Sequence, residues 1–438
     1  MNKITFIMLP VMFLSLQSSA FTLEEAIQTA LNQRGDITAA ENNFESAVWS
    51  RNSAHTWMLP QVDFSLSYQQ SHDVQEMNIP GMGSIPMGAE WSSMYGVSAT
   101  LPLVLQGPIG AEMSSKALDL SENSLMGARQ DAISNVVSSF YGVLMAEMMA
   151  EVTTEAITIA REGFLLAEQR FNAGTISRFE LLQSQVAYEN RRPDSIAALT
   201  GAENARAAFS VSLGYPENRP ASVEGKLTDP FPVVLPETIE EARSIMENSS
   251  IELNTAEVMR EMGDAQVNLA GAAFAPQLVF QTSYGFQASV NEISEISGDD
   301  YSRNWTTSAS LQVPLFHGIS DYSGYRSARA ERRASFAQAQ DLENYSYLSL
   351  TAAWNSLNQA KETVLAAKST VGQAEEAAGI ATISYEAGMI TRLDMDGAFL
   401  ALTQARTNYA SALYSLKTAE VALARILGIL NFNIEEKN

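Results

Sequence analysis

The chain has 438 residues, of which 46% are hydrophobic and 18% charged, and 50 acidic against 27 basic residues give a formal net charge of −23 at pH 7. Such acidity argues against nucleic-acid binding, because proteins that bind nucleic acids carry basic patches. The sequence contains no cysteine, which excludes disulfides, thiolate catalysis, cysteine-based zinc sites and a lipidated N-terminal cysteine.

Residues 1–20 have the pattern of a secretory signal peptide. A basic start, "MNK", precedes an apolar core, "ITFIMLPVMFLSL", and the small residues "QSSA" predict cleavage after Ala20. This core is too short to span a bilayer, and no later stretch reaches about 18 consecutive apolar residues, which excludes helical membrane spans. The sequence therefore predicts a secreted protein.

The rest of the chain is a tandem repeat. "TLEEA" aligns with "TIEEA", "LPQVDFSLSY" with "APQLVFQTSY", "LPLVL" with "VPLFH", and "FNAGTISRFELL" with "YEAGMITRLDMD". Two copies are predicted, over residues 21–215 and 236–430, each with a helix, two strands, a long helix, a glycine turn and another helix. A proline-rich linker (216–235) joins them, and a short tail (431–438) follows.

Four strands are predicted from the strict alternation of apolar and polar residues, at about 60–71, 91–103, 276–288 and 303–314. Each is about ten residues long, the length of a tilted strand in a membrane barrel. Two soluble hairpins with one face on a core also explain the alternation, but no other segment supplies an apolar layer to cover them. In lipid, four strands would leave two open edges, so several chains would have to pool strands into a barrel of at least about eight.

Two long helices are predicted at about 109–171 and 319–385, where proline is absent and glycine is sparse. At about 1.5 Å per residue, each forms a rod of roughly 95 to 100 Å. The helix after the second turn has a heptad seam, formed by Met395, Ala398, Leu402, Ala405, Tyr409, Ala412, Leu416, Ala419, Leu423 and Ile426. In the first copy, Pro193 predicts a kink or break near Arg192. A soluble coiled-coil stalk explains these helices, but not the strands or the secretion signal.

Together these features make the chain resemble the TolC-like outer membrane efflux proteins, also called the channel-tunnel family. The resemblance rests on the signal peptide, the opening "TLEEAIQTALNQ", the strand starts "LPQV" and "APQL", the strand ends "LPLVLQG" and "VPLFHG", and the two "AG" turns. Each motif alone is weak, but their duplicated order covers nearly the whole mature chain.

The resemblance implies a mainly α protein with a membrane β-barrel portion. As a homotrimer, three chains would each give four strands to a twelve-stranded barrel in the outer membrane of a Gram-negative bacterium, continuing into a coiled-coil α-helical tunnel through the periplasm. It implies a passive exit duct of a tripartite efflux or type I secretion system. Its partners would be outer-membrane lipid, a periplasmic adaptor (membrane fusion) protein and an inner-membrane pump of RND, ABC or MFS type. The linker and the C-terminal end would lie in an equatorial region around the tunnel.

The resemblance also implies that the two glycine turns are the periplasmic tips of the tunnel, where the adaptor docks. The residues implied are Gly174, Thr175, Ile176, Gly388, Met389 and Ile390. Glycine suits a tight turn and a flat tip that another hairpin can approach closely. The plainer interpretation is that each glycine merely ends its helix, but duplication at equal spacing favours docking.

A periplasmic gate is implied near the turns by Asp394, Asp396, Tyr385, Arg392, Glu180 and Arg178. Asp394 stands where the family has an aspartate that constricts the entrance. Three copies would form a ring of carboxylates that attracts cations, and neutralising this ring is expected to raise channel conductance.

The gate of this chain would depart from the family pattern at two places. The family's second constriction aspartate falls on Gly397, with Asp396 on a different helix face, and its locking arginine falls on Ile390. Arg392 or Arg178 would have to replace that arginine. Alternatively, Asp394 and Glu180 are ordinary acidic residues that are favourable near helix N-termini.

No catalytic or metal site is predicted. The three histidines, His55, His72 and His317, have no partner at catalytic or metal-ligand spacing, and no phosphate loop or nucleophile elbow occurs. Methionines in "MNIPGMGSIPMGAEWSSM" are soft Cu(I) ligands, but a flexible extracellular loop is the simpler interpretation. We expect no cofactor. Two rival classes stay open: a periplasmic coiled-coil adaptor or structural protein without a barrel and, more weakly, an enzyme.

Overall fold

The computed structural model describes residues 20–74, 76–81, 83–86, 88–216, 221–291 and 298–430. The predicted signal peptide (apart from Ala20), the C-terminal tail and residues 217–220 of the predicted linker therefore lie outside the described residues. The chain divides into two compact units. The first comprises Met1–Glu41, Ser124–Leu253 and Glu343–Asn438, and the second comprises Asn42–Asn123 and Asn254–Leu342.

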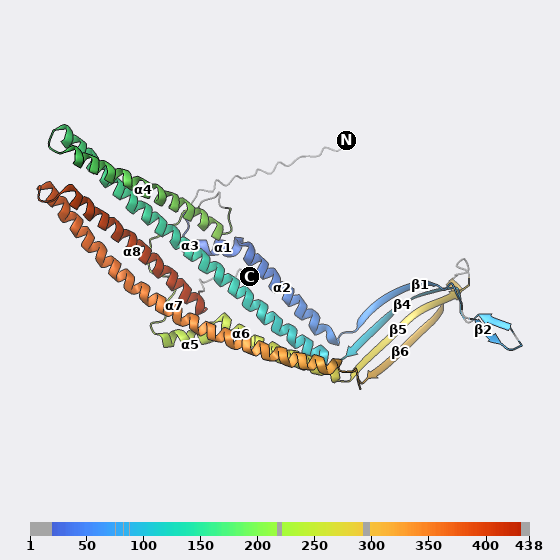
Figure 1. Ribbon diagram of the computed structural model, residues 1–438. Coiled ribbons are helices and arrows are strands. Elements are labelled where there is room, and N and C mark those ends of the chain that lie inside the picture. Colours follow the sequence, from blue (N-terminus) through green and yellow to red (C-terminus); the bar gives the residue numbers. More distant parts are fainter. Residues whose placement is uncertain are drawn as a thin grey trace, which may run out of the picture. The chain divides into compact units, whose positions relative to one another are not determined.

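The helices of the two repeats match in length (Figure 1). α3 (Gln106–Asn172) and α7 (Ser320–Glu386) each have 67 residues, and α4 (Arg178–Ser212) and α8 (Arg392–Ile426) each have 35. In each repeat a short turn follows the long helix, and the shorter helix then runs back beside it. At about 1.5 Å per residue, each long helix measures about 100 Å.

Each repeat opens with two helices rather than the one that we predicted: α1 (Leu23–Gln33) and α2 (Gly35–Ala54), then α5 (Ile239–Ser249) and α6 (Ile251–Gly271). A single extended residue separates each pair, with φ −73° and ψ 130° at Arg34 and φ −72° and ψ 127° at Ser250. The Arg34 guanidinium pairs with Asp36 at 2.6 Å and donates to the Ser212 carbonyl at 3.1 Å. These bonds hold the chain where it changes direction, so the prediction of one opening helix is wrong.

The main core of the first unit lies among α1, α3, α4 and α8. Phe209 of α4 is fully buried, and its ring meets those of Phe140 and Phe21 edge-on, with centroids 5.9 Å and 6.2 Å away. The described part of the linker closes over this core, because the Phe21 N–H donates to the Ser222 carbonyl and the Glu224 N–H donates to the Phe21 carbonyl, both at 2.9 Å. The linker thus ties the start of the chain to its middle.

α3 is the one helix of the described residues that is long and apolar enough to cross a membrane, with a window of mean hydropathy 1.2 that is 44% buried. The same helix supplies Val136, Val137 and Phe140 to the main core, where the first two are 0% exposed. A core helix satisfies the same criteria of length and composition, and packing therefore explains the hydropathy of α3.

Of the kink or break predicted near Arg192, the break is wrong, because α4 runs without interruption through Pro193. A proline removes one backbone hydrogen bond and its ring presses on the preceding turn. The helix is held against α3 on both sides of the proline, because Tyr188 stacks on Phe164 with centroids 6.1 Å apart and Arg206 pairs with Glu147 at 2.6 Å. These contacts outweigh the loss of one hydrogen bond.

A second, smaller core in the first unit joins α5, α7 and α8. Its fully buried members include Met246, Leu350, Leu357, Leu423 and Leu427. α7 contributes Leu350, Ala353 and Leu357 to it, spaced three and four residues apart, as a helix with one buried face does.

Truncating Leu350 is expected to destabilise this core. Leu350→Ala should lower the free energy of unfolding by about 2–5 kcal/mol, because Leu350 is 1% exposed and its removal leaves a cavity. Leu348→Ala is the matched control, since Leu348 lies two residues away on the same helix and is 63% exposed. Thermal unfolding measures both variants, and equal midpoints would contradict the packing of α7 described above.

The second unit contains a four-stranded antiparallel sheet in the order β1–β4–β5–β6 (Figure 1). Its strands are β1 (Gln61–Gln70), β4 (Trp91–Leu103), β5 (Gln277–Val290) and β6 (Ser302–Gln312). β4 and β5 pair across the repeats, so the hairpins of both copies form one sheet. Along the chain, β1 and β4 are separated by a two-stranded ribbon of β2 (Glu76–Ile79) and β3 (Gly83–Pro86). Only a loop was predicted for this segment.

The strand register places side chains of one kind in rows across the sheet. One row consists of Phe64, Val97, Tyr284 and Trp305, and the adjacent row consists of Ser65, Gly96, Gly285 and Asn304. Because successive residues of a strand point to opposite faces, one face of the sheet is apolar and the other is polar or small. Both edge strands, β1 and β6, are exposed along their whole length.

Helices of the second unit are joined by polar contacts. Lys116 of α3 pairs with Glu261 of α6 at 2.8 Å, and Arg332 of α7 pairs with Asp264 of the same helix. α6 is therefore bonded to the first parts of both long helices.

Candidate functional site

Both turns between the long and the short helices have the same backbone structure. Gly174 has φ +74° and Gly388 has φ +73°, in the left-handed region that favours glycine. The N–H of each glycine donates to the carbonyl three residues back, at 2.8 Å and 3.0 Å. The next N–H, of Thr175 or Met389, reaches five residues back, at 2.9 Å and 2.8 Å. This is the Schellman closure of a helix, so local structure alone accounts for both glycines.

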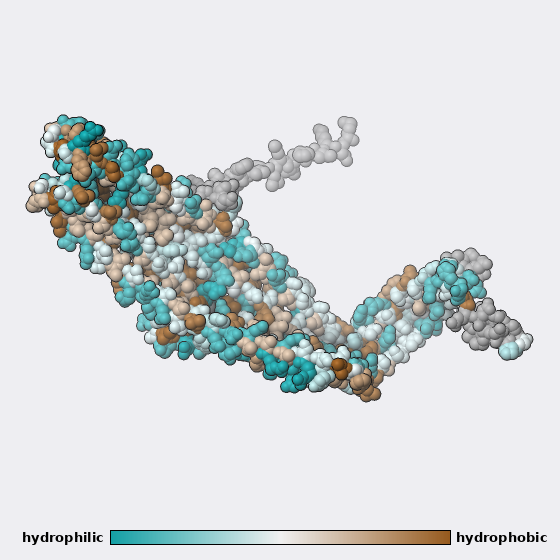
Figure 2. Space-filling model, in the orientation of Figure 1, coloured by the Kyte–Doolittle hydropathy of each residue, from teal (hydrophilic) through white to brown (hydrophobic). Residues whose placement is uncertain are grey.

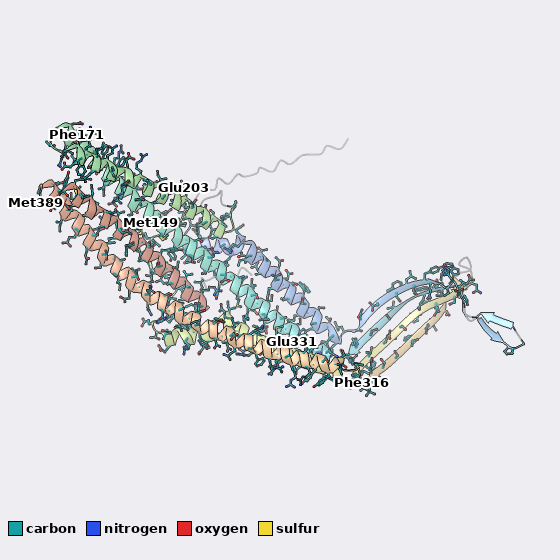
Figure 3. The ribbon with its side chains drawn as sticks, in the orientation of Figure 1. Met149, Phe171, Glu203, Phe316, Glu331 and Met389 are labelled. Atoms are coloured by element: carbon teal, nitrogen blue, oxygen red, sulfur yellow. The ribbon has the colours of Figure 1, made fainter. Side chains whose placement is uncertain are left out.

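The turns present their side chains openly. Met389 is 71% exposed, Thr175 is exposed, and Ile176 and Ile390 are half-buried. A side chain added at either turn glycine would meet no atom within 4 Å. Figure 2 shows hydrophobic atoms in brown among hydrophilic ones at the turn between α3 and α4 and at the turn between α7 and α8. Figure 3 labels Phe171 and Met389 there. Both tips thus have room for a partner.

Asp394 is part of the structure that begins α8. Its carboxylate accepts hydrogen bonds from the Thr391 N–H at 2.9 Å and from the Thr391 hydroxyl at 2.6 Å, while its own N–H donates to Thr391 Oγ1 at 3.3 Å. Such a capping box satisfies backbone N–H groups at a helix start. The bonds from the side chain and then the backbone of Thr391 lower the pKa of Asp394. Asp394 therefore has the helix-terminal role of the alternative interpretation.

We expect the start of α8 to loosen in acid. The capping bonds favour the ionised carboxylate, so their contribution is complete above the ordinary pKa of 3.8 and is lost as the pH falls through the lowered pKa of Asp394. Below the lowered pKa, the amide hydrogens of residues 391–394 should exchange faster than the intrinsic pH dependence of exchange alone predicts. Asp394→Ala should exchange rapidly at every pH, and wild-type protection in that variant would contradict the capping role.

Arg392, the first residue of α8, is buried although it carries a permanent charge. The residue is 9% exposed, and its Nη2 lies 2.9 Å from Asp396 Oδ1. Its guanidinium carbon lies 5.7 Å from the centroid of the Tyr385 ring. Among the described residues its Nε has no hydrogen-bond partner. The carboxylate and the ring are what stabilise this charge, because a buried cation is costly without partners.

Tyr385 also contacts a second cation, which the sequence did not reveal. Arg170, near the end of α3, donates from Nη1 to the Tyr385 hydroxyl at 3.2 Å, and its guanidinium carbon lies 5.4 Å from the ring centroid. Tyr385 thus joins α3 to the start of α8. The repeat carries no signal for this contact, because Ser384 occupies the position that corresponds to Arg170 in the second copy.

The corresponding residues of the first repeat are arranged differently. Arg178 is exposed and makes no ion pair with any other described residue, although it aligns with Arg392. The Glu180 N–H donates to the Ser177 hydroxyl at 3.2 Å, and Glu180 is exposed. Of the six predicted gate residues, the structure brings together Tyr385, Arg392 and Asp396, whereas Asp394, Glu180 and Arg178 stand apart from them.

The ion pair of Arg392 and Asp396 borders a groove between the first turns of α4 and α8. This groove has a volume of about 480 Å³, and its other lining residues are Phe179, Leu182, Gln183, Val186, Ala187 and Leu393. Further along α8, Arg406 pairs with Glu155 of α3 at 2.6 Å and with Glu375 of α7 at 2.9 Å. α8 is therefore bonded to its neighbours at two levels.

The ionisable side chains serve these helix contacts. Within the described ranges, no group of three or more histidine, cysteine, aspartate or glutamate side chains is arranged to hold a metal ion. His317 Nδ1 lies 2.8 Å from Asp321 Oδ2 in an exposed pair one helical turn apart.

Fold and site together define a class of protein. One unit is a bundle of paired helices joined by apolar cores and ion pairs, and the other carries a sheet with an apolar face and two exposed edges. This combination is that of an outer-membrane channel with a tunnel of helices and a β-barrel part. The chain belongs to the outer membrane efflux protein family, whose model matches residues 26–215 and 243–429. It is an outer-membrane channel for efflux or secretion in a Gram-negative bacterium.

Individual relatives show the same likeness. The chain is 28% identical over 335 residues to the cobalt-zinc-cadmium resistance protein CzcC of Cupriavidus metallidurans, covering 75% of each chain. It is 21% identical over 427 residues to the outer membrane protein TolC of Escherichia coli, covering 94% of this chain and 83% of that one. The structure of the CmeC outer membrane channel of Campylobacter jejuni superposes with a TM-score of 0.80 and 18% identity, over 93% of this chain and 85% of that one.

Proposed function

We propose that three copies of this chain form a passive exit duct that is closed at its helix turns in the resting state. The observation that supports the assembly is the sheet. Its edge strands β1 and β6 are exposed along their full length, and unpaired backbone groups are not tolerated in the hydrocarbon of a bilayer. If β6 of one copy pairs with β1 of the next, three copies of four strands give a closed barrel of twelve.

In this proposal, one face of the sheet contacts lipid and the other lines the lumen of the barrel. The apolar row of Phe64, Val97, Tyr284 and Trp305 would face outer-membrane lipid, since the outside of a membrane barrel is apolar. The opposite face, with Ser65, Gly96, Gly285 and Asn304, would line an aqueous channel. A polar lumen of this kind suits a conduit for varied cargo rather than an enzyme.

The gate is proposed at the second glycine turn, that of Gly388, in each of the three chains. Arg392 is buried between Tyr385 and Asp396, so the start of α8 is fixed to α7 and, through Arg170, to α3. Asp394 keeps the helix end formed and adds an exposed carboxylate close to it, which in three copies would attract cations to the entrance. Releasing Arg392 would free α8 to move away and widen the entrance. Arg178 and Glu180 of the first repeat would contribute only exposed charge.

The solvent-exposed tips are proposed as the docking surface for a periplasmic adaptor (membrane fusion) protein. That adaptor would itself be bound to an inner-membrane pump of RND, ABC or MFS type. The tips comprise Gly174, Thr175, Ile176, Gly388, Met389 and Ile390. The cargo would be chosen by the pump, because the relatives differ in cargo: CzcC is a cobalt-zinc-cadmium resistance protein, and AprF of Pseudomonas aeruginosa, 22% identical over 316 residues, is an alkaline protease secretion protein.

The absence of cysteine from the chain makes the docking proposal testable in cells. A single cysteine at Met389 or Thr175 is expected to cross-link to a secreted coiled-coil protein, identified by mass spectrometry as an adaptor. A cysteine at Leu348, which is exposed on α7 far from the turns in sequence, is the control. Equal cross-linking of the adaptor at all three positions would contradict docking at the tips.

The duct itself is tested in planar lipid bilayers with the purified, detergent-extracted protein. We expect discrete current steps with a preference for cations, because the chain carries a formal net charge of −23 and exposed carboxylates at the proposed entrance. The absence of current steps from both the assembled wild type and the Arg392→Ala variant would contradict the proposal.

A further inference from the structure

The burial of Arg392 depends on a residue of another helix that carries no functional group. Gly163 lies in α3, near the end of that helix at Asn172, and is buried. A Cβ atom built on Gly163 would lie 2.6 Å from Arg392 Cζ and 2.8 Å from its Nη1, and closer still to its Nη2. All three distances are shorter than those that real Cβ atoms show, so the guanidinium occupies the space that every other residue at position 163 would fill.

We propose that Gly163 is a positioning residue of the gate: it forms a slot in α3 that admits the Arg392 guanidinium and so holds the entrance closed. The slot is open on one side to the ring of Tyr385 and on another to the carboxylate of Asp396. Arg392 therefore connects α8 to α3 by shape, and to α7 through the ring of Tyr385. This inference rests on the gate proposed above and names the feature of α3 against which that gate closes.

The backbone of α3 does not itself require a glycine at position 163. Gly163 lies inside a continuous helix, and no positive φ is found there. Glycine is a poor helix former compared with alanine, so helix formation alone would favour another residue. The contact with Arg392 is the one that an added methyl group would abolish, since all three of the nearest atoms to the built Cβ belong to that guanidinium.

The test compares Gly163→Ala, Arg392→Ala, the double variant and Gly127→Ala in planar bilayers. Gly127 is the matched control, because it lies in the same helix and an added Cβ there meets no atom within 4 Å. Gly163→Ala and Arg392→Ala should each raise the ratio of open to closed channels by about tenfold, which corresponds to about 1.4 kcal/mol. The double variant should equal either single variant, because both changes remove one contact, and Gly127→Ala should match the wild type.

A wild-type open probability in Gly163→Ala, or additive effects in the double variant, would overturn the slot. A glycine needed only for packing would lower the thermal midpoint with or without Arg392, whereas a slot is needed only while Arg392 is present. If Gly163→Ala fails to assemble, assembly of the double variant supports the slot, and failure of both overturns it.

A second measurement separates the slot from the gate. Arginine-specific dicarbonyl labelling is read by mass spectrometry. It should modify Arg178 in every variant, because Arg178 is exposed. It should modify Arg392 in Gly163→Ala but not in the wild type, where Arg392 is buried. Labelling of Arg392 in Gly163→Ala without a change in conductance supports the slot and contradicts the gate. Protection of Arg392 in that variant overturns the slot, whatever the conductance.

Discussion

Arg392→Ala is expected to open the duct. The substitution removes the ion pair with Asp396 at 2.9 Å and the contact with the Tyr385 ring, and it takes from the first residue of α8 its buried contact with α7. A loss of about 1–3 kcal/mol in the closed state corresponds to an increase of about 5- to 150-fold in the ratio of open to closed channels. Single-channel recording in planar bilayers measures that ratio directly.

The matched control for this experiment is Arg178→Ala. Arg178 aligns with Arg392 in the repeat and starts the equivalent helix, but it is exposed. The control removes the same charge from the equivalent place and should leave the ratio of open to closed channels within about twofold of the wild type, since exposed charges contribute little. Equal effects of the two substitutions would mean that net charge, and not the buried contact, controls the entrance.

Placing a charge on the apolar face of β6 is expected to prevent assembly. Ala309→Arg would expose a guanidinium to lipid in the same row as Phe280 of the neighbouring strand, and a charge on the lipid face costs up to about 2–4 kcal/mol per chain, the highest values applying at the middle of the bilayer. Three copies multiply that cost. We expect Ala309→Arg to lack the heat-sensitive oligomer that the proposal predicts for the wild type in mild detergent.

Ser308→Arg is the control for that variant. Ser308 is the preceding residue of β6 and pairs with Gln281, so its side chain points to the polar face. A guanidinium there would lie in the aqueous lumen, and the oligomer should persist with altered ion selectivity. Loss of the oligomer in both variants, or in neither, would contradict the assignment of the two faces.

The features that the sequence predicted well are those with a local pattern. Alternation along a strand is a property of neighbouring residues. It predicts a strand at about 60–71, and β1, which contains Phe64 and Ser65, spans Gln61–Gln70. The glycine turns follow from the same logic, because a helix end needs a residue with positive φ, and Gly174 and Gly388 have it. Duplication then added what one copy alone would not show.

The features that the sequence did not predict depend on contacts between distant segments. Arg392 and Arg178 align in the repeat, yet one is buried and the other exposed, because only Arg392 meets a glycine of α3 and a tyrosine of α7. The extended residue at Arg34 depends likewise on a bond to the carbonyl of Ser212. Such pairs lie far apart in the sequence, and no local pattern records them.

Asp394 illustrates why a residue that aligns with a family site still needs its geometry. Resemblance alone placed it at a constriction, and the structure shows that both its carboxylate and its N–H bond to Thr391. A helix cap and an exposed ring of charge are compatible roles, since the carboxylate remains ionised in both. The conductance of Asp394→Ala, beside its hydrogen exchange, separates the two contributions.

The mass of the protein extracted from cell membranes in mild detergent tests the trimeric duct most directly. Light scattering on material from the outer-membrane fraction should give the mass of three chains, and heating should reduce it to that of one. A soluble monomer recovered from the periplasmic fraction would contradict the shared barrel, and with it the gate and docking surface proposed for its tips.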